Sequence, residues 1–179
     1  MTNISEMMLT KKLAALVTSL ILLLPSCSGT PDTHKIEDNN IEALFSPEGR
    51  CADRVISELN TAKRTVVAAI YSLTSRPIAQ AAADAKARGV DVRICLDGTE
   101  RHEYSKEGYL KNKGVAIKLV SGKGLMHNKF CVIDGAVVIT GSFNWTRRAD
   151  TENDENLLII NSKEIAAKYK KKFEELWRR

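Results

Sequence analysis

From residue 41 onward, short apolar runs alternate with segments of helical periodicity, and this alternation limits the fold more than any other feature. We expect strands at 41–45, 65–71, 90–96, 116–120, 127–133, 136–140 and 156–160. We expect helices after Ser46, after Ser75, over 105–113 and over 163–177. Interleaved strands and helices pack as a sheet covered by helices. The predicted class is therefore α/β, with a mixed sheet flanked by helices in a single domain.

Two prolines mark expected helix starts. Ser46 and Pro47 predict an N-cap followed by the first helical residue, and Pro77 predicts the start of the second helix. Gly89 is a typical stop for that second helix. The helix over 163–177 has one apolar face, which consists of Ile165, Tyr169, Phe173 and Leu176.

The first 26 residues are typical of an export signal. Lys11 and Lys12 precede an apolar run over 13–24, which is short for a membrane span. We therefore expect residues 1–26 to be a signal peptide that directs export to the periplasmic side of a bacterial membrane.

The end of this run resembles a lipoprotein processing site. Leu24 stands at −3, Ser26 at −1, and Cys27 follows, although Pro25 departs from the small residue usual at −2. We expect lipidation of Cys27, which would anchor the protein to the membrane. An ordinary secretory signal and an uncleaved anchor remain alternatives. Residues 27–40 would be a tether.

Residues 41–179 are enough for one domain with its own core. They contain Cys51, Cys95 and Cys131. This odd number argues against a full disulfide framework, although a single disulfide between two of them remains an alternative. Cys95 and Cys131 lie within apolar runs, where we expect them to be buried. No Cys or His cluster predicts a metal site, and we expect no cofactor.

The net charge of +5 indicates a polyanionic partner. Because Glu6, Lys11 and Lys12 give the signal segment a net +1, the rest of the chain carries +4. Nucleic acid and an anionic lipid surface both fit this mild excess.

The densest group of reactive side chains lies in the last third of the chain. His127, Lys129 and Asp134 are spaced HxKxxxxD, and after six residues follow Gly141-Ser142-Phe143-Asn144. Since side chains alternate along a strand, His127 and Lys129 should share one face. The alternative is a hairpin with an incidental His and Lys.

This pattern resembles the signature of the phospholipase D superfamily. Further segments are similar to its small single-motif bacterial endonucleases: 45–49, 69–72 and 88–92. The resemblance covers roughly residues 41–177 and makes 41–179 a phospholipase D-like catalytic domain. It implies metal-independent phosphodiester hydrolysis in two steps, through a phosphohistidine at His127 that water then releases.

The residue types suit that chemistry. One ring nitrogen of His127 can attack phosphorus while Lys129 neutralises a nonbridging oxygen, and Ser142 and Asn144 can donate to the phosphate. The other ring nitrogen needs an acceptor. The resemblance favours Glu155 over Glu152 and Asp154 for this role. Asp134 would face the opposite side of a regular strand, so we assign it a structural role.

A single HxK pair has a consequence for assembly. Attack on phosphorus needs a nucleophile and a second acid, and His34 and His102 lie in polar segments better suited to the surface. The resemblance implies a homodimer in which two His127 side chains meet across a twofold axis.

The sequence leaves two classes of substrate open, nucleic acids and phospholipids. The leading hypothesis is an endonuclease acting on DNA or RNA. The candidate contacts to the phosphate backbone are Arg101, Lys106, Lys123, Arg147 and Arg148. We expect little sequence specificity, because no strand face is rich in aromatic residues. The alternative is a phospholipase D acting on phosphatidylcholine or cardiolipin, since the motif recognises the phosphodiester alone. A binding protein without activity is a third reading, which the intact set of five site residues disfavours.

Overall fold

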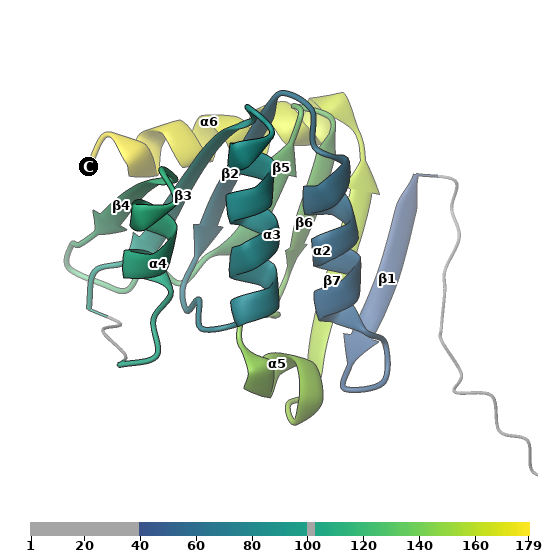
Figure 1. The fold of residues 1–179 in the computed structure, drawn as a ribbon. Coiled ribbons are helices and arrows are strands. Elements are labelled where there is room, and N and C mark those ends of the chain that lie inside the picture. Colours follow the sequence, from purple (N-terminus) through teal and green to yellow (C-terminus); the bar gives the residue numbers. More distant parts are fainter. Residues whose placement is uncertain (1–39, 100–102) are drawn as a thin grey trace, which may run out of the picture. The chain divides into compact units, whose positions relative to one another are not determined.

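A seven-stranded mixed sheet forms the centre of the computed structural model, which describes residues 40–99 and 103–179 (Figure 1). Its strands are β1 (Ile41–Ser46), β2 (Thr65–Ile70), β3 (Asp91–Asp97), β4 (Ala116–Val120), β5 (Lys129–Ile133), β6 (Val137–Gly141) and β7 (Glu155–Asn161). Its helices are α2 (Cys51–Thr61), α3 (Arg76–Ala87), α4 (Glu107–Asn112), α5 (Arg147–Thr151) and α6 (Lys163–Trp177). The predicted α/β class is confirmed.

The strand order is β1-β7-β6-β5-β2-β3-β4. β2, β3 and β4 run parallel to one another, and all other neighbours are antiparallel. This order brings the ends of β2 and β6 to the same edge of the sheet as the beginnings of β5 and β7. We call this edge, with the loops that leave it, the site edge, because the motif residues lie there.

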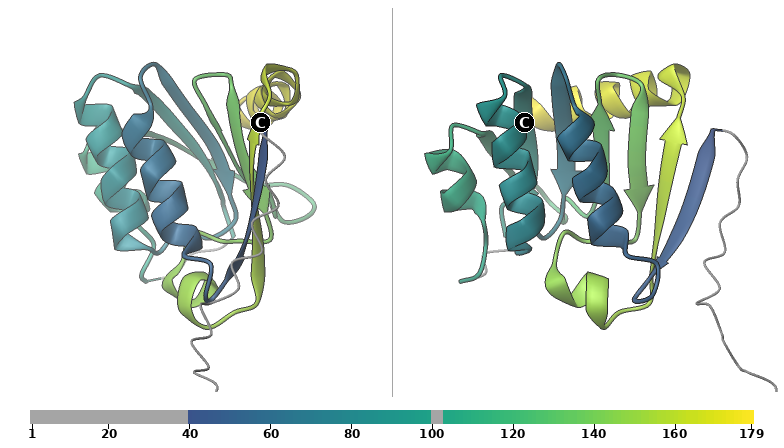
Figure 2. Two further views of the ribbon diagram at one scale, coloured as in Figure 1. Left: turned by 90° about the vertical axis from the view of Figure 1, so that its right-hand side faces the viewer. Right: turned by 45° about the vertical axis from the view of Figure 1, so that its right-hand side comes forward.

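Helices cover both faces of the sheet. α2 and α3 lie on one face and α6 lies on the other (Figure 2). Residues alternate along β2, so that Val66 and Ala68 enter the core under α2 and α3, whereas Val67 and Ala69 enter the core under α6. A strand buried on both faces is a continuous apolar run, which is why the sequence revealed it readily.

The apolar face predicted for the last helix packs on the sheet. Phe173 and Leu176 are buried in α6, while Ile165 and Tyr169 are partly buried. Ser162 caps the helix, because its hydroxyl accepts a hydrogen bond from the Ile165 amide at 3.3 Å.

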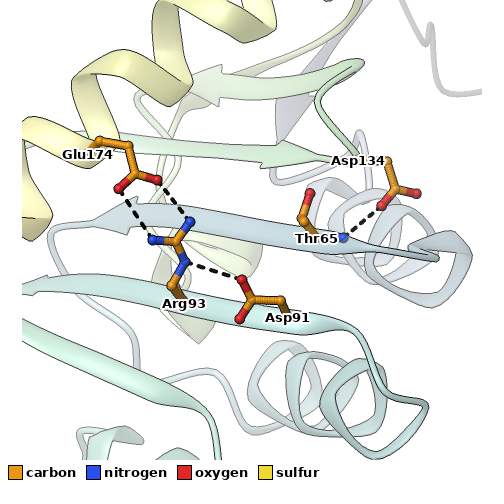
Figure 3. A network of polar contacts seen from close by, with 5 residues as sticks. All are labelled: Thr65, Asp91, Arg93, Asp134 and Glu174. Carbon is orange, nitrogen blue, oxygen red and sulfur yellow. Dashed lines mark hydrogen bonds and ion pairs between the residues drawn. The ribbon is translucent and has the colours of Figure 1, made fainter.

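One arginine fastens α6 to the sheet. Arg93 of β3 donates to both carboxylate oxygens of Glu174 at 2.8 and 3.3 Å (Figure 3). Its guanidinium carbon also lies 5.2 Å from the ring centre of Phe173 and 5.6 Å from that of Trp177. A bidentate ion pair combined with two aromatic contacts gives this side chain a defined position.

The predicted start of the first helix is wrong. Ser46 is the last residue of β1, and α2 begins at Cys51. The amide of Gly49 donates to the Phe45 carbonyl at 2.7 Å, which closes a turn between Pro47 and the helix. The Ser46 hydroxyl caps no helix and instead donates to the carbonyl of Ala149 at 2.6 Å, holding α5 against β1. The second helix begins at Arg76, as Pro77 predicted.

Cys51, Cys95 and Cys131 are free and buried, so the predicted burial of Cys95 and Cys131 is confirmed. Burial raises the pKa of the Cys51 thiol to about 11 and that of Cys95 to about 12. Outside the described residues lie the signal segment 1–26, Cys27, the tether up to residue 39, and His34 and His102. In residues 40–99 and 103–179, no helix is long and apolar enough to cross a bilayer.

Candidate active site

The candidate catalytic residues His127 and Lys129 lie beside the same aromatic ring. The ring of Tyr71, at the end of β2, lies with its centre 4.5 Å from that of His127. The same ring lies 5.0 Å from Nζ of Lys129, which in turn donates to the His127 carbonyl at 2.9 Å. Tyr71 lies in the segment 69–72, which resembles the superfamily, but the sequence alone predicted no role for this residue.

His127 does not belong to a strand, contrary to the sequence prediction. β5 begins at Lys129, and His127 lies exposed on the loop before it. This loop is fixed on both sides of His127. The Asn128 carbonyl accepts from the Tyr71 amide at 2.9 Å, and the Met126 amide donates to Asp97 at 2.6 Å.

Asp97 is a positioning residue that the sequence did not reveal. It ends β3, is buried, and also accepts from the Thr99 amide at 2.8 Å. Because its carboxylate bonds with Met126, it ties β3 to the residue next to His127. The local signal for it is an acidic residue directly after the apolar run 90–96, a pattern that is equally typical of a turn.

The charge of Lys129 is set by two opposing effects. Burial lowers the pKa of its ammonium group, and the negative charge of Glu155 acts against that effect. The pKa stays below the ordinary value on balance. In its ammonium form, Lys129 can act as a positive donor beside His127, which is what neutralisation of a phosphate oxygen requires.

Ser142 and Glu155 meet across β6 and β7. The Ser142 hydroxyl donates to one Glu155 oxygen at 2.5 Å, and the Asn153 side-chain amide donates to the other at 3.0 Å. The predicted bond between Glu155 and the His127 ring is not formed within this chain. Gly141 permits the close approach of the two strands, because a Cβ there would lie 2.2 Å from the Asn156 carbonyl oxygen.

Asn144 is fixed by its side-chain carbonyl. Its Oδ1 accepts from the Ser72 amide at 3.3 Å, next to Tyr71. This contact leaves the amide nitrogen of Asn144 as the donor group of the side chain. The structure therefore brings His127, Lys129, Ser142, Asn144 and Glu155 to the site edge from three separate segments.

Asp134 lies at the opposite end of β5 from Lys129. Its carboxylate accepts from the backbone amides of Lys63, Arg64 and Thr65 at 2.8–3.0 Å, and Figure 3 shows the bond to Thr65. Burial alone would raise the pKa of Asp134, but these three amides and the Arg64 charge together lower it. Its contacts are structural, and none of them involves the site edge.

A cleft of about 660 Å³ opens beside Tyr71, the residue whose ring contacts His127 and Lys129. Tyr71 and Asn144 line it, together with the cations Lys106, Arg147 and Arg148. Its other lining residues are Ser72, Thr74, Tyr104, Thr146 and Asn153. Among the described residues, the lining thus includes three cations and two aromatic rings, with no acidic and no aliphatic side chain.

Of the candidate phosphate contacts, Lys106, Arg147 and Arg148 line the cleft and Lys123 does not, while Arg101 lies outside the described residues. Arg147 begins α5, a short helix that the sequence did not predict. Arg148 also forms an exposed ion pair with Glu152 at 3.4 Å. Tyr104 and Asn153 were not identified from the sequence, because the cleft joins segments far apart in the chain.

Metal ligands do not cluster in the part of the chain that the structure describes: it holds no group of three or more His, Cys, Asp or Glu side chains placed to bind a metal ion.

Solved structures share this fold. Nuc from Salmonella typhimurium, a phospholipase D family member, is 33% identical with a TM-score of 0.73, over 77% of this chain and 93% of that one. NucT from Helicobacter pylori is 28% identical with a TM-score of 0.74, over 77% of this chain and 95% of that one.

Curated relatives carry lipid-related names. A mitochondrial cardiolipin hydrolase from Xenopus laevis is 35% identical, over 76% of this chain and 70% of its own length. A phospholipase D from Rickettsia bellii is 32% identical, over 75% of this chain and 68% of its own length. Residues 55–177 match the family described as cardiolipin synthase, PLD-like domain. With this match and relatives at these identities, the chain belongs to the phospholipase D superfamily and is a phosphodiester hydrolase.

Proposed function

We propose that the protein is an endonuclease that hydrolyses DNA or RNA without a divalent metal. The observation that carries this choice is the cleft beside Tyr71, the residue in contact with His127 and Lys129. In residues 40–99 and 103–179, its lining contains three cations and no aliphatic side chain. Phosphate backbones are recognised by Arg and Lys together with hydroxyl and amide donors, all of which line the cleft. The resemblance of the sequence to small single-motif endonucleases supports the same choice, and the fold is shared with Nuc and NucT.

The reaction would proceed in two displacements. A ring nitrogen of His127 forms a bond to phosphorus, and the bond from phosphorus to the leaving oxygen breaks as that oxygen takes up a proton. Water then attacks the phosphohistidine, the phosphorus–nitrogen bond breaks, and His127 is regenerated. Lys129, Ser142 and Asn144 would stabilise the negative charge on the nonbridging oxygens.

The proton for the leaving oxygen requires a second acid. We propose that it comes from the second His127 of a homodimer, because this chain has one HxK pair. His127 is exposed on its loop, which suits a group that meets a partner. Its own Glu155 is engaged by Ser142 and Asn153, so the ring acceptor of His127 would also be completed in the assembly.

A phospholipase D activity is the second candidate. Leu125, two residues before His127, is 56% exposed, and an apolar side chain at that position could contact a lipid surface. The names of the relatives from Xenopus laevis and Rickettsia bellii favour this reading. The cleft lining disfavours it, because acyl chains need aliphatic surroundings.

The test is cleavage in excess EDTA. Plasmid DNA, single-stranded DNA, RNA and phosphatidylcholine/cardiolipin vesicles are offered in parallel to the purified protein and to the variant His127→Ala. We expect cleavage of nucleic acid alone. The variant should lose at least about a thousand-fold in turnover, as expected when a nucleophile is removed, yet still bind nucleic acid. Head-group release with intact nucleic acid would establish the lipid enzyme instead.

We also propose that the protein is exported and anchored through a lipid on Cys27. The support is the signal-like segment 1–26, and the proposal is independent of the substrate. Mass spectrometry of membrane-extracted protein should show an acylated N-terminus at Cys27. A Cys27→Ser variant should retain residues 1–26 and carry no lipid. An unmodified Cys27 in a processed chain would contradict the anchor.

A further inference from the structure

We propose that the cleft beside Tyr71 is a base-binding subsite that receives one unstacked nucleotide next to the scissile phosphate, so that the strand is single-stranded where it is cut. This inference rests on the proposed nuclease function. It adds the state of the substrate and the residues that select it.

Two tyrosines supply the surface for a base. Tyr71 contacts the catalytic group directly, with its ring centre 4.5 Å from that of His127, and the same ring lines the cleft. Tyr104 lines the cleft from the segment before α4, and 69% of its surface is exposed. Aromatic rings placed along a cationic groove are the usual platforms on which single-stranded nucleic acids stack their bases.

The remaining lining suits the sugar–phosphate backbone. Lys106, Arg147 and Arg148 provide positive charge, and Asn144 and Asn153 provide amide groups. None of the described lining residues is acidic, so the charged side chains that line the cleft would attract a phosphate. The cleft volume of about 660 Å³ lies within the range typical of sites for small molecules, and a single nucleotide belongs to that size class.

The position of Tyr71 argues for an unpaired strand. A phosphate attacked by His127 carries its neighbouring nucleoside close to this ring. In a duplex that base is paired and stacked inside the helix, and it reaches such a pocket only after being flipped out, at a cost of a few kcal/mol. A single strand can place the base there without breaking pairs.

The experiment removes one base at a time. Single-stranded DNA oligonucleotides, each with one abasic residue at a different position around a mapped cut, are compared by kcat/KM with the intact strand and its duplex. In the native protein, we expect removal of the base next to the cut to lower kcat/KM roughly 5- to 100-fold, as stacking on an aromatic ring predicts. The duplex should be cut more slowly than the strand.

Variants of Tyr104 locate the effect. Tyr104→Ala should abolish most of the difference between intact and abasic strands, whereas Tyr104→Phe, which keeps the ring, should preserve it. Phe45→Ala is the matched control, because Phe45 is also an exposed aromatic residue, at 53%, but does not line the cleft. Its ratio of intact to abasic cleavage should equal that of the native protein.

The outcomes separate the two proposals. Cleavage that is insensitive to base removal, or equal on strand and duplex, overturns the subsite while leaving the nuclease in place. A base effect that persists in Tyr104→Ala overturns the assignment of Tyr104 as the residue that binds the base. Failure to cut any nucleic acid, with lipid cleavage retained, overturns the proposed function and the subsite with it.

Discussion

Lys129 connects the electrostatics of the site to a measurable pH profile. Burial lowers its pKa and Glu155 raises it, so Glu155→Gln should lower the pKa of Lys129 further. Since catalysis needs the charged amine, the alkaline decline of kcat/KM should move to lower pH in Glu155→Gln, whatever the remaining rate. The control variant Asp154→Asn removes a neighbouring exposed carboxylate. In this variant, kcat/KM should decline at the same alkaline pH as in the native protein. An unchanged decline in both variants would contradict the coupling.

Asp134 should matter for stability and not for chemistry. Asp134→Asn keeps the shape and tolerates the positive φ of 53° at this position, but it weakens the hydrogen bonds to three amides. We expect a loss of about 1–3 kcal/mol in the free energy of unfolding, measured with urea at neutral pH. The kcat/KM of the folded variant should stay within about two-fold of the native value.

The pH dependence of the stability lost in Asp134→Asn tests whether the ionised carboxylate causes it. The pKa of Asp134 is lowered in the folded state, so its ionised form stabilises the protein above the unfolded pKa, about 3.9. The stability difference between native protein and Asp134→Asn should be full at pH 6. It should shrink as the pH falls through the lowered pKa. A large loss of activity at full stability would instead make Asp134 part of the chemistry.

At the scale of elements, the packing of α6 on the sheet depends on Arg93. Arg93→Lys retains the charge but loses the two-pronged contact with Glu174 and the contacts with Phe173 and Trp177. We expect about 1–2 kcal/mol of destabilisation by urea unfolding. The matched control is Arg50→Lys, because Arg50 pairs with Asp53 in an exposed ion pair that should contribute little. Equal effects of the two changes would contradict the role of Arg93.

The elements also show what a sequence can predict. The buried strands and the two long helices could be predicted because burial and periodicity are local patterns. α5 has five residues, too few to show a period, and Ser46 bonds with it across more than a hundred residues. The motif His127–Lys129 could be found by spacing. Asp97 and Tyr104 could not, because only the sheet order and its loops bring them to the site.

At the scale of the whole molecule, the proposed composite site makes activity depend on assembly. Light scattering should give the mass of a dimer at working concentration, and specific activity should fall on dilution as dimers dissociate. Adding excess His127→Ala to the native protein should lower activity beyond simple dilution, because mixed dimers lack one of the two His127 groups. An active monomer, or no loss on mixing, would contradict the composite site.

The pairing of β1 with β7 has a consequence for when activity can arise. Ile41 pairs with Ile160 and Ser46 pairs with Glu155. The first strand can therefore join the sheet only when β7, near the C-terminal end of the domain, is present. Contacts this distant in sequence form late in folding. A chain threaded through a translocation channel from its N-terminus could therefore not complete the site while its C-terminal part remained inside the cell. If the protein is exported and cleaves nucleic acid, as proposed, it would therefore become active only after leaving the compartment in which it was made.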